Sequence, residues 1–316
     1  MTSAIALASP IRLLAASRDG TSLVAVHETS LSRVTVASGA VVDAGPVPGV
    51  VYACAVTPDG RALLLGTRTP VLVDLDARTV APPVFKGPAS ASNAVTFSPD
   101  ASAVYLAHGS FAASGDCYVY AFDLATRALR WRAAPTPRDG VTDVACVGDR
   151  VVAFGEQGVV VLLDPARGAS LGRVQLTPPA PYGEAMVHGA MLDGAHVVAA
   201  TLKEAVPLVA RVRLEAGALP ITWQTPIEID EASDDEGFIV GRPLVARDTV
   251  HVPVRWSDGT APRVTLFALD AATGEHRGEC DLDGCVDHRA ALLLPDGRVA
   301  WADGSTVRIE AIEAAS

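Results

Sequence analysis

Lysine is almost absent from this chain of 316 residues, in which it occurs only as Lys86 and Lys203. The 25 basic residues are scattered and are outnumbered by 36 acidic residues, so the formal net charge is -11. A protein that neutralises nucleic-acid phosphates, or that binds an anionic membrane, needs clustered basic side chains. We therefore expect neither a nucleic acid nor a membrane as a partner.

Long apolar runs are missing as well. No stretch approaches the roughly 18 residues that a membrane-spanning helix needs. The first ten residues carry no basic segment of the kind that opens a secretory signal. The cysteine count, five, is odd, and Cys54 and Cys146 lie in apolar runs where a thiol packs as a small hydrophobic group. These features favour a reduced, cytoplasmic protein.

The common catalytic and phosphate-binding motifs are also absent. The sequence contains no Gly-x-Ser-x-Gly, His-Glu-x-x-His, Gly-x-x-x-x-Gly-Lys or Cys-x-x-Cys pattern. We therefore expect no catalytic residues, no metal and no cofactor. The open alternative is a metal or proton-transfer site built from His108, Asp143, His188 and His288, whose separations the sequence does not give.

The sequence does contain a degenerate repeat. Apolar runs of four to eight residues end at Gly, Pro or Asp, which is typical of strands and turns. One pattern recurs seven times, an apolar run followed by a tight turn and a second apolar run. The turn aspartates are Asp19, Asp59, Asp100, Asp149, Asp193, Asp248 and Asp296. Their mean spacing of about 46 residues is close to the length of a four-stranded propeller blade.

A second aspartate follows an apolar run in four of the copies, at Asp74, Asp123, Asp164 and Asp270. A carboxylate at the start of a turn accepts backbone N–H groups of that turn. We therefore expect these four aspartates to fix hairpins between strands, a structural role and not a catalytic one.

Several segments resemble known repeat families. The Phe-Ser-Pro-Asp and Pro-Asp-Gly turns resemble those of WD40-like and YVTN propellers. The segment Leu-Phe-Ala-Leu-Asp-Ala-Ala-Thr-Gly-Glu resembles the outer hairpin of quinoprotein-like propellers, and Trp131 and Trp223 fall near outer strands as in quinoprotein repeats. The resemblance implies an all-β fold, a seven-bladed β-propeller with four-stranded blades.

We expect residues 1–316 to form a single β-propeller domain whose ring is closed by the N-terminal strand. The expected blades are 11–45, 50–88, 91–135, 140–178, 184–228, 238–282, and 288–316 plus 2–9. The last copy has strands at 290–294, 298–302 and 306–312 but no residues for a fourth. Residues 2–8 are left over at the other end, and a propeller joins its ends by supplying such a strand.

Binding residues are expected on the face where the second strand of each blade ends, here the top face, because loops on a rigid scaffold concentrate such residues. The candidates at strand ends are His27, Arg68, His108, Glu156, Lys203, Arg255 and Trp256. An acidic loop over 228–236 adds Asp234, Asp235 and Glu236. A second ring of residues, where the first strands begin, comprises Arg12, Tyr52, Asn93, Thr142, Met186, Gly241 and Arg289.

The function that these features favour is a non-catalytic protein–protein interaction module, or scaffold subunit, that presents its top face to a partner protein. A bacterial multi-protein system with an AAA+ ATPase or a von Willebrand A-type component is the candidate context. The alternative is a propeller hydrolase resembling lactonases, with its site at the channel mouth and the four His and Asp candidates named above.

Overall fold

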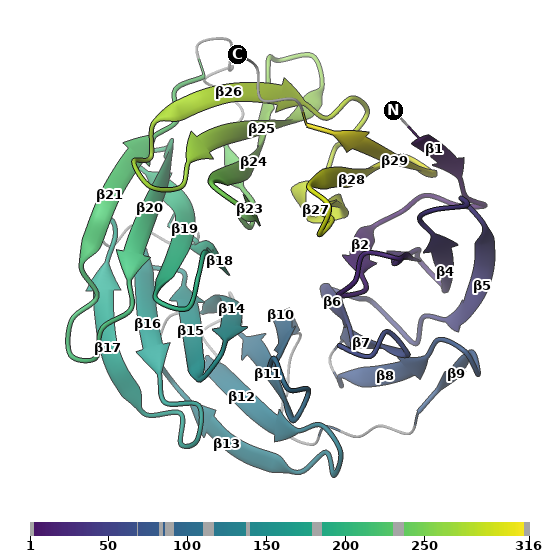
Figure 1. Ribbon diagram of the computed structural model, residues 1–316, viewed down its shortest axis with the longest axis horizontal. Coiled ribbons are helices and arrows are strands. Elements are labelled where there is room, and N and C mark those ends of the chain that lie inside the picture. The colour runs from purple at the N-terminus through teal and green to yellow at the C-terminus, as the bar shows by residue number, and fades with distance from the viewer. Residues whose placement is uncertain are drawn as a thin grey trace.

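Seven antiparallel sheets form a closed ring around a central axis (Figure 1). The computed structural model describes residues 3–67, 69–81, 85, 92–109, 117–136, 140–178, 185–229 and 237–312. These residues contain no α-helix, and the short 3₁₀ helix η1 (His288–Ala290) is their only helical turn. The expected all-β, seven-bladed propeller is confirmed.

Each of the first four blades is a meander of four strands that runs from the axis outward. Blade 1 comprises β2 (Leu13–Ala16), β3 (Ser22–Val26), β4 (Ser30–Thr35) and β5 (Val41–Pro46). Blade 2 comprises β6 (Ala53–Val56), β7 (Ala62–Gly66), β8 (Val71–Asp74) and β9 (Thr79–Val80). Blade 3 comprises β10 (Ser92–Phe97), β11 (Ala103–His108), β12 (Tyr118–Asp123) and β13 (Leu129–Ala133). Blade 4 comprises β14 (Val141–Val147), β15 (Arg150–Gly155), β16 (Val159–Leu163) and β17 (Ser170–Gln175).

The last three blades depart from this pattern at two points, the inner strand of blade 6 and the outer strand of blade 7. Blade 5 comprises β18 (His188–Met191), β19 (His196–Lys203), β20 (Val206–Arg213) and β21 (Ile221–Pro226). Blade 6 comprises an inner strand in two pieces, β22 (Ile239–Val240) and β23 (Leu244–Ala246), then β24 (Thr249–Ser257), β25 (Pro262–Asp270) and β26 (His276–Asp281). Blade 7 comprises β27 (Ala291–Leu293), β28 (Arg298–Asp303), β29 (Thr306–Ala311) and the N-terminal β1 (Ser3–Ala6).

The N-terminal strand closes the ring as expected. β1 pairs antiparallel with β29, so that Ser3 lies opposite Ile309 and Ile5 lies opposite Val307. Figure 1 shows β1 and β29 side by side at the seam between the last and the first blade. β29 is therefore paired on both edges, with β28 on its inner side and β1 on its outer side.

The turn between the first and second strands carries the same hydrogen bonds in the first three blades. Ser17, Thr57 and Ser98 each donate from their hydroxyl to the turn aspartate two residues on, at 2.6 Å. In blade 1, hydrogen bonding lowers the pKa of Asp19 to about 2, and the bond from the Ser17 hydroxyl is the main cause. A charged aspartate thus fixes each of these turns at neutral pH.

The second set of aspartates has the expected structural role. Asp74 Oδ1 accepts the backbone N–H of Ala77 at 2.7 Å, and Asp123 Oδ1 accepts that of Thr126 at 2.8 Å. Asp164 and Asp270 accept equivalent backbone N–H groups in their own turns. Each carboxylate therefore caps the hairpin between the third and fourth strands of its blade.

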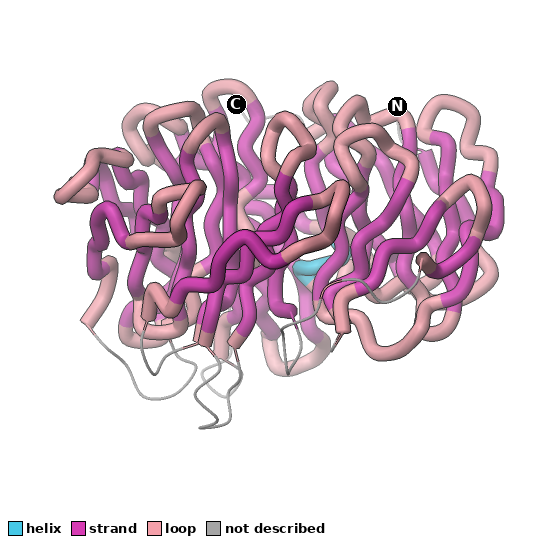
Figure 2. The backbone as a smooth tube through the Cα atoms, turned by 90° about the horizontal axis from the view of Figure 1, so that it is seen from below, coloured by secondary structure: helices cyan, strands magenta, loops and turns pink. Residues whose placement is uncertain are grey.

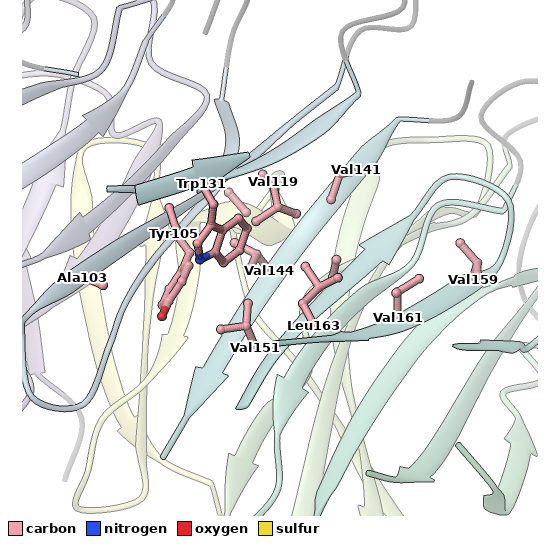
Figure 3. Close-up of a cluster of buried hydrophobic side chains, with 14 residues drawn as sticks. Ala103, Tyr105, Val119, Trp131, Val141, Val144, Val151, Val159, Val161 and Leu163 are labelled. Carbon is pink, nitrogen blue, oxygen red and sulfur yellow. The ribbon is translucent and has the colours of Figure 1, made fainter. Parts of the chain in front are cut away.

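Tryptophans on two outer strands join neighbouring blades. Trp131 on β13 donates from Nε1 to the carbonyl of Pro165 in blade 4, at 2.8 Å. Its ring also packs into the apolar cluster between blades 3 and 4, beside Tyr105 (Figure 3). Trp223 on β21 makes the same bond to Ala271 in blade 6, at 3.3 Å. The hairpin of each acceptor blade is thereby fixed to the blade before it.

Gly168 leaves room for the indole of Trp131, and replacing it tests this contact. A Cβ at Gly168 would lie 2.5 Å from the ring, and its φ of +69° is one that L side chains rarely adopt. Gly168→Ala is expected to lower the free energy of unfolding by about 2 kcal/mol, through backbone strain and overpacking. Gly148 has a φ of +55° and no atom within 4 Å of such a Cβ, so Gly148→Ala shows the strain alone. The free energies of unfolding of both variants are measured by urea denaturation. If Gly148→Ala lowers this free energy as much as Gly168→Ala does, the contact with Trp131 is contradicted.

The loops collect on two opposite faces of the ring (Figure 2). The turns capped by aspartate lie on one face. The connections between blades, and those between second and third strands, lie on the other, which is the top face. The inner strands therefore begin at the top face.

None of the described residues form a helix long and apolar enough to cross a membrane.

Candidate functional site

The inner strands of all seven blades surround a cavity of about 220 Å³ on the ring axis, which we call the channel. Blades 1 to 3 contribute mainly apolar side chains such as Leu13, Ala53 and Ala94. The charged and imidazole side chains of the lining come only from blades 4 to 7. They are Asp143, His188, Arg242, His288 and Arg289.

A buried ion pair crosses the polar side of the channel. The Asp143 side chain on β14 is 2% exposed, and it accepts two hydrogen bonds from Arg242, one of them from Nε at 2.8 Å. The backbone N–H groups of Val144 and Gly189 donate to the same carboxylate, at 2.7 and 3.2 Å. Burial alone would raise the pKa of Asp143, but the charge and hydrogen bonds of Arg242 hold it well below its usual value. Asp143 is therefore charged at neutral pH.

Arg242 reaches Asp143 because the inner strand of blade 6 is broken. The segment 241–243, Gly-Arg-Pro, separates β22 from β23, and Pro243 has no N–H to give to a strand ladder. The Arg242 side chain turns into the channel instead, and Nη2 also donates to the carbonyl of Val144 at 3.2 Å. Blades 4 and 6 are thus linked directly, past the inner strand of blade 5.

Two histidines lie above this ion pair, with ring centroids 6.3 Å apart. His188 Nδ1 is 3.8 Å from an Asp143 oxygen. His288 lies in η1 against Gly241, where a Cβ would be 2.8 Å from its ring. Only glycine therefore allows this approach of blade 7 to blade 6.

The His288 imidazole is neutral at physiological pH. Its pKa is lowered to about 4, first by burial and then by electrostatic repulsion from the neighbouring His188 imidazole when both rings are protonated. Arg289 and Arg255 add to this lowering, while the carboxylate of Asp287 opposes it.

The channel opens at the top face into a wider cavity of about 530 Å³, which we call the mouth. It is lined by Tyr52, Asn93, Thr142, Met186, His188, Ile239, Arg255, Val286, Asp287, His288 and Arg289. Five of these, Tyr52, Asn93, Thr142, Met186 and Arg289, belong to the ring of residues expected where the first strands begin. Of the other two in that ring, Gly241 contacts His288 and Arg12 pairs with Glu28.

Four of the candidates at strand ends are buried inside the blades. His27 is held by the Pro10 carbonyl at 3.0 Å and the Ser32 hydroxyl at 2.9 Å. His108 packs edge-on against Tyr120, and Glu156 accepts the N–H of Gly140 at 3.1 Å. Trp256 donates from Nε1 to the Thr265 hydroxyl at 2.9 Å. Because these four side chains are buried, they are not exposed for contact with a partner.

The remaining candidates fall into two groups. Lys203 is exposed at the end of β19, and Arg255 lines the mouth. Arg68, Asp234, Asp235 and Glu236 lie outside the described residues. Among the strand-end candidates that the structure describes, Arg255 is the one that lines the mouth.

Sequence reasoning missed Arg242, Ile239, Val286 and Asp287 as lining residues. The Gly-Arg-Pro interruption of an inner strand marks Arg242, because no other copy breaks there. Val286 and Asp287 lie between the sixth and seventh copies, and no sequence pattern sets that connection apart.

Three of the four residues proposed for a metal or proton-transfer site, Asp143, His188 and His288, do line the channel, whereas His108 is buried against Tyr120 in blade 3. Across the ranges that the structure describes, no three His, Cys, Asp or Glu side chains are placed to hold a metal ion. The ion pair with Arg242 already occupies the Asp143 carboxylate.

Comparisons with solved structures identify similar rings. A chain of Kuenenia stuttgartiensis hydrazine synthase is 14% identical, with a TM-score of 0.76 and 98% of each chain covered. The WD40 β-propeller domain of Doa1 is 12% identical, with a TM-score of 0.71 and coverage of 99% of this chain and 98% of that one. The β-propeller domain of Cps50 (Swd1) from Myceliophteria thermophila is 11% identical, with a TM-score of 0.70 and coverage of 99% and 100%.

The sequence itself matches no family model and no curated protein. At identities of 14% or less, the structural likeness establishes the fold alone. The chain is a seven-bladed β-propeller of four-stranded blades, similar in fold to WD40 domains and to the hydrazine synthase propeller.

Proposed function

We propose that this chain is a non-catalytic interaction module whose top face binds a partner protein around the mouth. The observation that carries the proposal is a set of exposed apolar side chains beside the cavity. Val50, Tyr52 and Val286 are 66%, 42% and 57% exposed. Large apolar groups left in water next to a concave surface are typical of interaction sites.

These side chains line two cavities of the top face that have Tyr52 in common. Tyr52 and Val286 both line the mouth, and Tyr52 and Val50 both line a shallow hollow above blade 2. Tyrosine is also among the residue types that contribute most to binding at interfaces. The likeness to WD40 domains agrees with this proposal, as an analogy between folds.

The partner belongs to the same proposal. An AAA+ ATPase or a von Willebrand A-type component of a bacterial multi-protein system remains the candidate, with the module acting as a scaffold subunit in the cytoplasm. Asp234, Asp235 and Glu236 would add a charged rim that steers association, an effect that depends on salt concentration.

The top face is tested by a pair of substitutions at the mouth. Tyr52→Ala with Val286→Ser is expected to weaken binding of a stoichiometric partner that copurifies with the native protein by at least tenfold. Both side chains are largely exposed, so the fold should be unaffected. Copurification identifies the partner by mass spectrometry, and titration calorimetry with that partner gives the change in affinity.

Matched substitutions elsewhere serve as controls. Leu171→Ser changes a 39% exposed apolar residue on the outer strand β17. Arg78→Glu and Arg167→Glu change exposed residues on the opposite face. None of these should alter the affinity. If the controls lose the partner and the pair at the mouth keeps it, the top face is not the binding surface.

A further inference from the structure

Of the two arginines that line the mouth, only Arg255 lacks a carboxylate partner among the described residues. Arg289 is neutralised by Asp287, to which Nε donates at 3.0 Å and Nη2 at 2.6 Å. Arg255 Nε donates to the Val286 carbonyl at 3.1 Å, and across the described residues no carboxylate lies within 4 Å of its guanidinium. In a chain of net charge -11, an arginine that lines the mouth without a carboxylate partner among the described residues marks a place for a negative group.

A polar atom of His288 also lacks a protein partner. Its Nδ1 is buried, and it makes no hydrogen bond within the part of the chain that the structure describes. The Asp287 oxygen at 3.8 Å is too distant for one. Buried polar atoms in folded proteins are normally satisfied, so a hydrogen-bond partner that reached this atom from the mouth would be stabilising.

The rest of the mouth is largely apolar. Tyr52, Met186, Ile239 and Val286 contribute to its wall. A cavity of this size, with apolar walls and a few convergent polar groups, suits a ligand that is apolar except at one end. A second negative charge would be repelled by Asp287 in the wall and by Asp143 deeper in the channel.

We propose that the mouth binds a single carboxylate carried on an apolar body. The carboxylate lies between Arg255 and His288, and the apolar body packs against Tyr52 and Val286. The source that we assign to this carboxylate rests on the proposed function. The carboxylate belongs to an acidic side chain that is flanked by apolar residues in the partner protein. The partner's binding segment is therefore acidic and apolar, not basic.

The carboxylate site is tested without the partner, with isovalerate as the probe. The His288 Cε1–H resonance, identified by its loss in His288→Gln, is expected to shift saturably with isovalerate. Isoamylamine, which has the same apolar body and the opposite charge, should cause no shift. Arg255→Gln should weaken isovalerate binding at least fivefold, because the guanidinium provides the charge. Arg12→Gln, which changes a top-face arginine outside the mouth lining, should leave it unchanged.

Three results would overturn the carboxylate site. They are equal shifts with isoamylamine, tighter binding of inorganic phosphate than of isovalerate, or full affinity in Arg255→Gln. Arg255→Lys keeps the positive charge, and it is expected to retain more affinity than Arg255→Gln. If Arg255→Gln fails to fold, Arg255→Lys and the amine probe still decide the question.

The source of the carboxylate is tested with two peptides. Acetyl-Leu-Glu-Leu-amide should displace isovalerate and compete with the partner, whereas the glutamine peptide should do neither. Isovalerate binding that the glutamate peptide cannot displace would contradict a partner segment as the source. If isovalerate binds as expected but the Tyr52 and Val286 variant keeps its partner, the proposed function fails and the carboxylate site stands.

Discussion

Deletion of residues 1–9 is expected to lower the free energy of unfolding by about 4 kcal/mol, because it removes the strand that closes the ring. β29 would lose the four residue pairs that β1 makes with it. The backbone hydrogen bond from Leu7 to the Ser305 carbonyl, directly after β1, would be lost as well. Loss of β1 would leave an open apolar edge, which other chains pair with readily.

Ile5 accounts for much of the expected loss. It is 9% exposed and packs in one cluster with Val307 and Ile309 of blade 7 and with Leu23 and Val34 of blade 1. Truncating a buried isoleucine typically costs about 2–5 kcal/mol. β1 is therefore both the fourth strand of blade 7 and the contact that joins the two ends of the ring.

Urea denaturation and sedimentation measure the two consequences of the deletion. The truncated chain should unfold at lower urea and associate through β29. Ile5→Asp should reproduce most of the loss in stability, while Ala4→Asp, at an exposed position of the same strand, should cause little. A truncated chain that melts at the native temperature and stays monomeric would contradict closure by β1.

The closure and the turn aspartates could be predicted from the sequence because each depends on local or countable features. The seven turns are separated by 40 to 55 residues, which is about one blade each, and the last copy lacks one strand. A carboxylate such as Asp123 acts on N–H groups within three residues of itself, so its role follows from the sequence alone.

The burial of the strand-end candidates could not be predicted in this way. In blade 6 the strands β24 and β25 are nine residues long, and Trp256 pairs with Arg263 inside that ladder. It is therefore part of the blade core, although the repeat places it at a strand end. The His27 partners, Pro10 and Ser32, come from the segment before β2 and from β4, and the repeat pattern does not indicate that they enclose the ring.

The channel ion pair is beyond sequence reasoning for a different reason. Asp143 and Arg242 are 99 residues apart and lie in blades that are not neighbours. Their distance depends on the diameter of the ring and on the break in one inner strand. The same holds for the approach of His188 to His288, which come from blades 5 and 7.

Removing Arg242 is expected to cost about 3 kcal/mol, more than removing the aspartate that it binds. Arg242→Met would leave the Asp143 carboxylate, which is 2% exposed, with only two backbone N–H donors and His188 nearby. An uncompensated buried charge is strongly destabilising. The expected value is at the low end of the usual range because 42% of the Arg242 side chain is accessible to water in the channel.

Asp143→Asn should cost only about 1 kcal/mol, since channel water can solvate the remaining guanidinium and the amide oxygen still accepts a backbone N–H. The double variant, Asp143→Asn with Arg242→Met, should be more stable than Arg242→Met alone, because it contains no buried charge. This reversal separates an electrostatic effect from lost packing, which would make the double variant less stable. Equilibrium urea denaturation of the three variants and the native chain gives all four free energies.

The pH dependence provides a second check on the same pair. In the native chain the pKa of Asp143 lies below its unfolded value, so its contribution to stability is present above the unfolded pKa and is lost as pH falls through the folded one. In Arg242→Met, burial acts without the arginine and raises the folded pKa above the unfolded value, so stability falls as pH rises between the two. The deficit of Arg242→Met should therefore be smaller at pH 4.5 than at pH 7.5. A deficit that is constant across this range would show that Arg242 stabilises the propeller by packing and not by pairing with Asp143.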